Sequence, residues 1–355
     1  MDALFVLPTM AAGGGERQFV TLARGLKQRG FEIGAVITGQ HGDHLRDDFE
    51  EFLLAEPFKD HGEAAAFVGM CLDARTPRAI VFHENDVAVR GLAEAEYRPP
   101  VVALIKHTVW ENDANFATRP DISAAVTDYI CVSEDNAHHL RGFGVGEERI
   151  HSIRNGVDPE FIAYPEGREQ ARADLGIPQD AFVVLHIGRL TDGKGTGLSV
   201  MALAHLPMCY GLFVGWGDQQ DMLMSVAGRY HMLDRVKFEP AVSDPRRFYA
   251  AANVLLLPTK AEGGIPYAVM EAAYAGIAVA STPVSDIPAL FGDGAYLQIE
   301  RNVAHIQQVL MQAERDRVGT ATVAARGQTI ARLHLTAERM TAQYEEVLFG
   351  ASSDR

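Results

Sequence analysis

The stretch from Leu255 to Gly276, LLLPTKAEGGIPYAVMEAAYAG, most constrains what this chain can fold into. Its three leading leucines form a short apolar run that is typical of a parallel strand covered on both faces. Pro258 ends the run, a glycine turn follows, and Pro266 suits the first turn of a helix, where no N–H is needed. Gly276 suits the C-terminal cap. This order of strand, turn and helix predicts an α/β fold with a parallel sheet.

Two carboxylates flank the turn in this stretch. Glu262 precedes the glycines, and Glu271 lies about one and a half turns into the expected helix. Between them, the helix N-terminus offers N–H groups and the positive end of a dipole, an arrangement that binds anions. Because carboxylates accept hydrogen bonds from hydroxyls, the stretch suits a sugar phosphate. An ordinary strand–turn–helix connection with two solvated glutamates is the alternative interpretation.

The same succession of strand, turn and helix recurs in both halves of the 355 residues. In the first half, strands are expected at residues 3–7, 33–37, 79–83, 101–105 and 129–132. In the second half they are expected at 182–187, 210–214, 236–238, 255–257 and 279–283. A polar segment with two prolines, residues 158–169, is the expected linker. The chain is therefore predicted to form two Rossmann-like domains that face an interdomain cleft.

Composition excludes several classes of function. The formal net charge of −15 argues against partners such as nucleic acid and anionic membranes, which attract basic patches. Cys71, Cys131 and Cys209 form no CxxC pair, so reduced, mostly buried thiols in a cytoplasmic protein are expected. Residues 1–10 read as a first strand and not as a signal peptide. No apolar run approaches the roughly 20 residues of a membrane span, so no transmembrane segment is expected.

Polar side chains follow several of the expected strands. Arg189 and Lys194 come after the strand at 182–187, at the edge where open α/β sheets bind ligands. His107 follows the strand at 101–105. The alternatives are two solvated basic residues in a loop and a hydrogen-bonded surface histidine. His83 begins a polar run, but the sequence contains neither HExxH nor DxD, so we expect no metal site.

These motifs resemble those of the retaining nucleotide-sugar glycosyltransferases of family four, which have the GT-B fold. The family's usual E-G-F-G-x-x-x-x-E-A-x-A-x-G separates two glutamates by seven residues. Here Glu262 and Glu271 are separated by eight. The EAAYAG that begins at Glu271 matches well, and Glu262 is displaced by one position. The segment GRLTDGKG, with Arg189 and Lys194, matches the family's G-R-L-x-x-x-K-G in type and spacing.

The resemblance implies a role for each of these residues. Arg189 and Lys194 would contact the donor diphosphate, Glu262 the transferred sugar, and Glu271 the ribose hydroxyls. The implied catalytic residues are Arg189, Lys194, Glu262 and His107. The implied donor-binding residues are Glu271, Gly264, Ile265, Tyr267, Ala268, Pro240, Gly14 and Gly15. Among these, the backbone N–H groups of Tyr267 and Ala268 would meet the diphosphate, and Pro240 would lie near the nucleotide base.

The resemblance also assigns the domains. Residues 1–157 would bind the acceptor, and residues 158–330 would bind the nucleotide sugar. A last long helix, at about 331–349, would cross back to the first domain. Gly14, Gly15 and Glu16 partly fit a G-G-x-E turn that faces the transferred sugar and the acceptor, and His107 would lie close to the donor sugar.

The expected function is therefore that of a cytoplasmic retaining glycosyltransferase that needs no metal and no cofactor. Its donor would be a UDP- or GDP-linked sugar, and its acceptor a hydroxyl on a glycan, a lipid-linked molecule or a small molecule. Two alternatives remain: a nucleotide-sugar 2-epimerase-like isomerase and a non-catalytic nucleotide-sugar-binding protein. The intact pair Arg189 and Lys194 argues against an inactive site. The sequence does not identify the base, the sugar, the acceptor or the oligomeric state.

Overall fold

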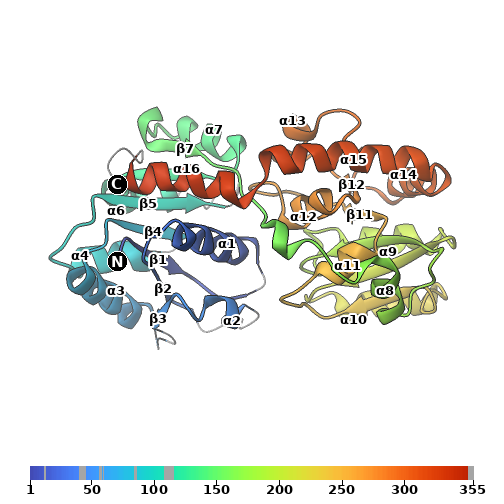
Figure 1. Cartoon of the computed structure of the whole chain (residues 1–355), viewed down its shortest axis with the longest axis horizontal. Helices are drawn as coiled ribbons and strands as arrows, with labels where there is room; N and C mark the ends of the chain where they lie inside the picture. Colours follow the sequence, from blue (N-terminus) through green and yellow to red (C-terminus); the bar gives the residue numbers. More distant parts are fainter. Residues whose placement is uncertain are drawn as a thin grey trace. The chain divides into compact units, whose positions relative to one another are not determined.

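The structure, a computed structural model, describes residues 1–11, 13–39, 45–55, 58, 60–83, 86–107 and 116–350. The chain forms two compact units. Unit 1 comprises Met1–Gly156 and Ala337–Arg355, and unit 2 comprises Val157–Thr336. Each unit contains one parallel sheet with helices packed on its faces (Figure 1).

Unit 1 contains a seven-stranded sheet in the order β3-β2-β1-β4-β5-β6-β7. Its strands are β1 (Ala3–Leu7), β2 (Ile33–Ile37), β3 (Leu53–Ala55), β4 (Ala79–His83), β5 (Val101–Lys106), β6 (Asp128–Cys131) and β7 (Ile150–Ser152). Its helices are α1 (Gly14–Gln28), α2 (Arg46–Phe49), α3 (His61–Arg75), α4 (Val87–Glu94), α6 (Pro120–Ala125), α7 (Glu134–Gly142), the 3-10 helix η1 (Glu147–Arg149) and α16 (Ala337–Phe349). Along β1, Phe5 and Leu7 pack into one apolar cluster and Leu4 and Val6 into another. This two-sided burial explains why the strand is a continuous apolar run.

Unit 2 contains a six-stranded sheet in the order β10-β9-β8-β11-β12-β13. Its strands are β8 (Phe182–Ile187), β9 (Cys209–Val214), β10 (Val236–Glu239), β11 (Val254–Leu257), β12 (Ala278–Ser281) and β13 (Leu297–Gln298). Its helices are η2 (Pro159–Phe161), α8 (Gly167–Asp174), α9 (Thr196–Ala204), α10 (Gln220–Arg229), α11 (Arg246–Ala251), α12 (Tyr267–Ala275), α13 (Ile287–Phe291), α14 (Val303–Arg315) and α15 (Arg317–His334). The predicted α/β class and Rossmann-like architecture of each half are confirmed.

The predicted stretch around Leu255 forms the central connection of unit 2. β11 lies between β8 and β12, and its leucines are almost completely buried. α12 follows the turn, with Pro266 at its N-cap and Gly276 at its C-cap with a φ of 77°. A left-handed cap of this kind favours glycine because it has no side chain.

The prediction of a single helix at 331–349 is wrong. α15 ends at His334 and α16 begins at Ala337. The interruption occurs because the backbone pairs elsewhere: Val157 N donates to Leu335 O at 2.9 Å, and Thr336 forms a β-bridge with Val157. Leu335 N still donates to Ala331 O at 2.8 Å, but the carbonyl of Leu335 is bonded to Val157 N and does not continue the helix.

The final helix packs in unit 1, as the resemblance implies. Gln18 Nε2 on α1 donates to Tyr344 Oη on α16 at 2.5 Å. Met340 and Leu348 belong to the same apolar cluster as α1 and β1. Burial raises the pKa of the Tyr344 hydroxyl, which therefore stays protonated.

The expected linker at 158–169 differs from a bare connection, because the segment packs into unit 2. Ile162 is buried in the apolar core of that unit. Arg168 Nη2 donates to Ala252 O at 2.8 Å, and α8 already begins at Gly167. Because the segment is mostly polar, its sequence did not indicate that Ile162 and Arg168 attach it to unit 2.

Candidate functional site

Each sheet contains a point at which the chain reverses the direction in which it adds strands. In unit 2 this point lies between β8 and β11, and in unit 1 it lies between β1 and β4. Ligands of open α/β sheets bind beyond the carboxyl ends of the strands at such points. We name the two regions the β8–β11 site (Arg189, Lys194, Glu262 and the start of α12) and the β1–β4 site (Gly14, Gly15, His83 and His107).

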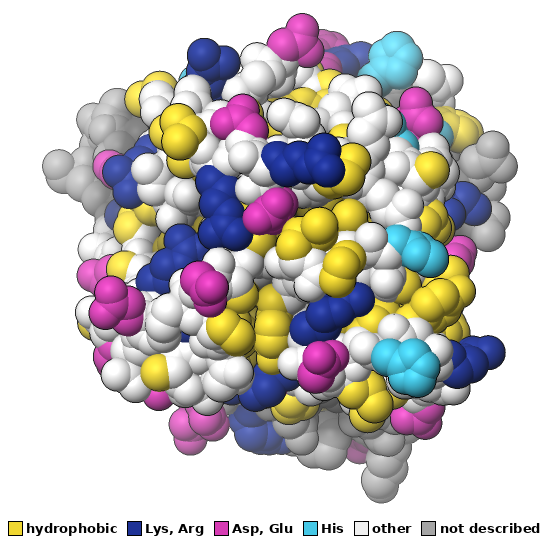
Figure 2. All heavy atoms as spheres, turned by 90° about the vertical axis from the view of Figure 1, so that its right-hand side faces the viewer, with side chains coloured by type: hydrophobic (Ala, Val, Ile, Leu, Met, Phe, Trp, Pro, Cys, Tyr) yellow, Lys and Arg dark blue, Asp and Glu magenta, His cyan; other side chains and the backbone are white. Residues whose placement is uncertain are grey.

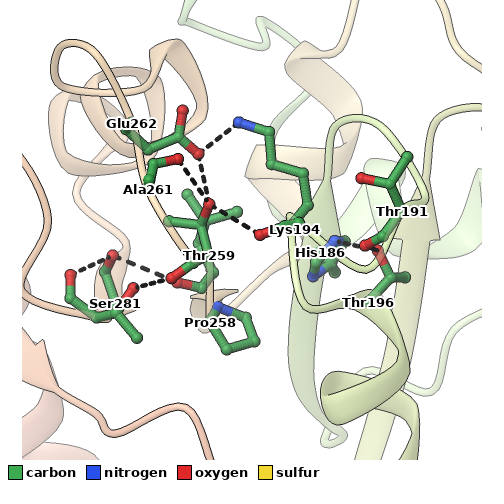
Figure 3. Close-up of polar contacts among 12 residues, drawn as sticks. His186, Thr191, Lys194, Thr196, Pro258, Thr259, Ala261, Glu262 and Ser281 are labelled. Carbon is green, nitrogen blue, oxygen red and sulfur yellow. Dashed lines mark hydrogen bonds and ion pairs between the residues drawn. The ribbon is translucent and has the colours of Figure 1, made fainter. Parts of the chain in front are cut away.

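The β8–β11 site brings together two residues that the sequence predicted separately. Lys194, in the loop after β8, forms an ion pair with Oε1 of Glu262, in the loop after β11 (Figure 3). Thr259 Oγ1 donates to the same carboxylate oxygen at 2.7 Å. The side chains of Lys194 and Glu262 are only 21% and 13% exposed. A cation and a carboxylate therefore lie side by side, partly shielded from water.

Backbone contacts join the two loops of the β8–β11 site. Lys260 N donates to Gly193 O at 2.8 Å. Arg301 donates through Nε to Pro258 O at 3.2 Å, and through Nη2 to Asp192 O. These bonds fix the loop that carries Lys194 against the loop that carries Glu262.

The glycine after Lys194 permits this close approach. Gly195 has a φ of 71°, and a Cβ at this position would lie 2.2 Å from Pro258 O. A side chain here would push the N-terminus of α9 away from the end of β11. The final glycine of the GRLTDGKG segment is thus required by packing as well as by backbone conformation.

A buried histidine on β8 contacts the start of α9, directly after the loop that carries Lys194. His186 on β8 contacts Ser199 Oγ through Nδ1 and Thr196 Oγ1 through Nε2, both at 3.1 Å. Burial lowers the pKa of His186 to about 4, so the ring is neutral at pH 7. A neutral ring donates to one hydroxyl and accepts from the other, and in this way it ties α9 to β8.

Arg189 and the start of α12 supply further groups for an anion. Arg189 is exposed, and its guanidinium makes no hydrogen bond or ion pair within the described part of the chain. At α12, Val269 N and Met270 N both donate to Pro266 O, at 2.9 and 3.1 Å. Ala268 N, one residue earlier, has no acceptor among the described residues, as is usual for the first turn of a helix.

The other predicted donor-binding residues lie around this helix and at a neighbouring strand end. Ile265 is buried and anchors the turn that begins at Gly264. Tyr267, the first residue of α12, is also buried. Pro240 is exposed and directly follows β10, whose last residue, Glu239, accepts through its backbone O from Gly215 N at 3.0 Å.

Glu271 has a different environment from Glu262. It is 7% exposed, and Oε2 accepts from Tyr249 Oη on α11 at 2.5 Å. The sequence did not single out Tyr249 or Thr259 as partners of the two glutamates. The contact of Thr259 could have been suspected, because its hydroxyl lies only three residues before Glu262. Tyr249 lies 22 residues from Glu271, so no local pattern indicates that contact.

In unit 1, the β1–β4 site is formed by a glycine turn and two imidazoles. Gly14 and Gly15 open α1, and the rings of His83 and His107 lie 4.6 Å apart. A Cβ at Gly15 would lie 3.2 Å from His83 Nδ1 and 3.6 Å from His107 Nε2. The structure brings His107 and Gly15 together and adds His83, which the sequence suggested only as part of a rejected metal site.

The two imidazoles of the β1–β4 site are neutral. Burial lowers the pKa of His107 to about 4, with a further contribution from Lys106. Burial also lowers the pKa of His83 well below its usual range, with a further contribution from His107. The Nε2 atoms of both rings are buried and have no hydrogen-bond partner in the part of the chain that the structure describes. Such atoms are suited to a ligand that can donate or accept.

Other observations bear on metals and membranes. Of the polar run after His83, residues 84 and 85 lie outside the described residues, and Asp86 forms an ion pair with Arg90 at 2.7 Å. The described residues include no group of three or more His, Cys, Asp or Glu side chains that could hold a metal ion. Within the same residues, no helix combines the length and the apolar character that crossing a membrane requires.

Comparisons with known proteins agree with this division into two units. The family model described as Glycosyltransferase Family 4 matches residues 12–161, and the model described as Glycosyl transferases group 1 matches residues 167–328. The chain is 32% identical over 165 residues to D-inositol 3-phosphate glycosyltransferase 1 of Catenulispora acidiphila, which covers 42% of this chain. It is 27% identical over 234 residues to D-inositol 3-phosphate glycosyltransferase of Streptomyces bingchenggensis, which covers 58% of this chain. These alignments span only 39% and 51% of the relatives' own lengths.

Solved structures share the fold over nearly the whole chain. The crystal structure of Anabaena HepE in complex with UDP-glucose superposes with a TM-score of 0.83 at 20% identity, covering 98% of this chain and 99% of HepE. Similarity at this identity concerns the fold, which is GT-B. With one family model on each unit and this fold throughout, the chain belongs to the family-four glycosyltransferases.

Proposed function

We propose that this chain transfers a sugar from a nucleoside diphosphate sugar to an acceptor hydroxyl, with retention of the anomeric configuration and without a metal ion. The observation that carries the proposal is the contact between Lys194 and Glu262 at the carboxyl end of the unit 2 sheet. A diphosphate needs a cation, and a sugar needs a hydrogen-bond acceptor. Both groups are present side by side, with the exposed guanidinium of Arg189 in the same loop as Lys194.

The β8–β11 site would bind the charged part of the donor. Arg189 offers a planar fork for two phosphate oxygens, and Lys194 adds a compact positive charge. The first N–H groups of α12, at Tyr267 and Ala268, would add donors at the positive end of the helix. Negative charge builds on the diphosphate as the sugar leaves, and these groups would stabilise it in place of a metal ion.

The remaining residues of unit 2 would bind the neutral parts of the donor. Glu262 would accept from hydroxyls of the transferred sugar, next to the turn at Gly264 and Ile265. Glu271 would accept from the ribose hydroxyls, and Pro240 would lie near the base. The HepE crystal contains UDP-glucose, which supports UDP-glucose as the first donor to test, with GDP-linked sugars next.

Unit 1 would bind the acceptor, and the residues of the β1–β4 site would contact the transferred sugar as well as the acceptor, as the resemblance implies. Gly15 lets the start of α1 lie against the imidazoles of His83 and His107, and the neutral ring of His107 suits a hydroxyl better than an anion. The acceptor class is a hydroxyl of a glycan, a lipid-linked molecule or a small molecule. Two relatives are named D-inositol 3-phosphate glycosyltransferases, which supports polyols as acceptors to test.

The free cysteines support a cytoplasmic location for this activity. Cys71, Cys131 and Cys209 are all buried and unpaired. Thiols persist in this state in reducing compartments. Cell fractionation tests this part of the proposal, and recovery from an oxidising compartment would contradict it.

The proposal is tested first by binding and then by turnover. UDP or GDP at 100 times its dissociation constant should stabilise the protein by about 2.7 kcal/mol in a thermal-shift experiment. The matching sugar nucleotide should then release its diphosphate faster when acceptor is present, in excess EDTA, and NMR of the first product should show retention.

A new sugar nucleotide formed without acceptor would indicate a 2-epimerase-like isomerase. Binding without turnover would indicate a non-catalytic protein, and an inverted product or a metal requirement would contradict the mechanism.

A further inference from the structure

The carboxylate of Glu262 is held through only one of its two oxygens. Thr259 Oγ1 donates to Oε1, and the ammonium of Lys194 contacts the same atom (Figure 3). Oε2 makes no hydrogen bond within the described part of the chain. A carboxylate held in this way keeps one oxygen oriented and able to accept from a ligand.

The hydroxyl of Thr259 directs its proton to Glu262. Gly193 O and Ala261 O also lie near Thr259 Oγ1, at 3.3 and 3.4 Å, but Glu262 Oε1 is much closer at 2.7 Å. A hydroxyl has one proton, and a bond to a carboxylate is stronger than a bond to a carbonyl. The contact with Glu262 therefore determines how the hydroxyl is oriented.

Thr259 itself has a fixed position. It is 1% exposed and follows β11 by two residues. Its backbone O accepts from Thr282 Oγ1 at 2.7 Å, and the adjacent Lys260 N donates to Gly193 O at 2.8 Å. The hydroxyl is therefore anchored to two neighbouring loops of unit 2 and does not depend on the longer glycine turn.

This anchor offers an explanation for the spacing of the two glutamates. The eight residues between Glu262 and Glu271 lie on the α12 side of Glu262. Thr259 lies on the opposite, β11 side, three residues before Glu262. A hydrogen bond from the β11 side fixes the carboxylate relative to the sheet, whatever the length of the turn that follows.

We propose that Thr259 is a positioning residue that holds Glu262 in place while Lys194 exchanges its partner, from Glu262 in the free protein to the diphosphate of the bound donor. This inference rests on the proposed function, because it takes the ligand to be a nucleoside diphosphate sugar. With Lys194 on the phosphates, Thr259 alone keeps Oε1 fixed, and Oε2 accepts from a sugar hydroxyl.

The exchange makes two predictions of opposite sign for Glu262→Gln. The variant removes the charge that competes for Lys194, so UDP should bind at least about threefold more tightly than to the wild type. UDP-glucose turnover should fall, because a carboxylate acceptor for the sugar is lost. If Glu262 did not compete for Lys194, UDP affinity would be unchanged or weaker.

Thr259→Val tests the positioning role, because valine keeps the shape and removes the hydroxyl. A lost hydrogen bond to a charged group corresponds to a roughly ten- to hundredfold effect, which we expect in kcat for UDP-glucose. UDP affinity should stay within about twofold, since Lys194 and Arg189 are untouched. Thr259→Ser restores the hydroxyl and should bring kcat back to within about threefold of the wild type.

Thr320→Val is the matched control for the loss of a buried threonine hydroxyl. Thr320 Oγ1 donates to Ala313 O at 2.9 Å, in helices that carry none of the proposed site residues. Its kcat should equal that of the wild type. Thr259→Val with wild-type kcat, or Thr259→Ser as slow as Thr259→Val, overturns the positioning role. Failure of the wild type to bind UDP or GDP would instead contradict the proposed function.

Discussion

The β8–β11 site of unit 2 carries ions, whereas the β1–β4 site of unit 1 carries neutral rings. Lys194 and Glu262 share a hydrogen-bonded ion pair and keep partial contact with water. His83 and His107 lie against each other and against Gly15, and the pKa of each ring is lowered by burial. Both regions nevertheless occupy the same place in their sheets, where the order of the strands reverses.

The difference shows how one architecture can present two kinds of chemistry. A charge persists near the protein interior only where a partner of opposite charge or water offsets the cost of desolvation. Lys194 and Glu262 meet that condition, and the two histidines do not, so the histidines are neutral. One site is thus suited to a diphosphate and the other to hydroxyls.

The largest expected effect is on the charged site. Lys194→Ala should lower turnover of the sugar nucleotide about 100- to 1000-fold, by analogy with the loss of one donor to a developing anion. Lys260→Ala is the control, because Lys260 is exposed in the neighbouring loop and only its backbone N–H contacts Gly193. Steady-state kinetics in excess EDTA measures both. Equal losses in the two variants would mean that general charge, and not this ammonium, is required.

The second prediction concerns acid stability. The pKa of His107 and of His186 is lowered to about 4 by burial, so below pH 6.5 the unfolded chain binds protons that the folded chain does not. The free energy of unfolding should therefore fall as the pH drops from about 6.5 to about 4, by about 3 kcal/mol for each ring. Urea unfolding of the wild type, His107→Asn and His186→Asn across this window measures it. His61→Asn, at an exposed position, is the control and should keep the wild-type slope.

The strands whose bounds the sequence predicted correctly share a physical cause. Strands buried on both faces are continuous apolar runs, which is why β1, β2, β4 and β8 begin and end at the predicted residues. Parallel strands are joined by connections that pass over a face of the sheet, so all the strands of a sheet end at the same edge. A glycine turn with an arginine and a lysine then necessarily falls at the carboxyl edge of β8. The class of the fold and the position of the β8–β11 site follow from these features.

The side chains that contact the predicted residues could not be predicted from the sequence in the same way. Tyr249 reaches Glu271 from another helix, and His186 supports the Lys194 turn from within a strand that reads only as apolar. The break at Leu335 depends on pairing with Val157, which is remote in sequence. Such contacts are set by packing in three dimensions, and no local spacing encodes them.

The third prediction distinguishes binding of the nucleotide by Glu271 from the hydrogen bond that Tyr249 donates to Glu271. Glu271→Ala should weaken binding of the nucleoside diphosphate by about 1.5–3 kcal/mol, because hydrogen bonds to a charged acceptor are lost. Tyr249→Phe removes the hydroxyl that donates to Glu271 and leaves the carboxylate in place, so it should affect stability more than affinity. Calorimetric titration measures the affinity of both variants, and urea unfolding measures their stability. If Tyr249→Phe alone weakened binding, the role of Glu271 would be indirect.

The smallest expected effect compares a glycine from each unit. Gly15 and Gly197 are each the second residue of the helix that follows the first strand of their unit. A Cβ at Gly197 would meet nothing within 4 Å, whereas a Cβ at Gly15 would press on His83 Nδ1 at 3.2 Å. Gly197→Ala should therefore stabilise the protein by about 0.4–1 kcal/mol, through the lower entropy of the unfolded chain.

Gly15→Ala should show no such gain, because the same entropic benefit of about 0.4–1 kcal/mol is offset by displacement of the His83 ring, which packs against His107. Thermal unfolding of the two variants measures the stability difference. Imidazole chemical shifts should move in Gly15→Ala for His83 and His107 and stay unchanged in Gly197→Ala, which links the effect to the rings. Equal stabilisation by both substitutions, with unmoved imidazole signals, would mean that the β1–β4 site is looser than its distances indicate. The neutral rings would then not be held in place by the glycine turn, and the contrast with the β8–β11 site would reduce to charge alone.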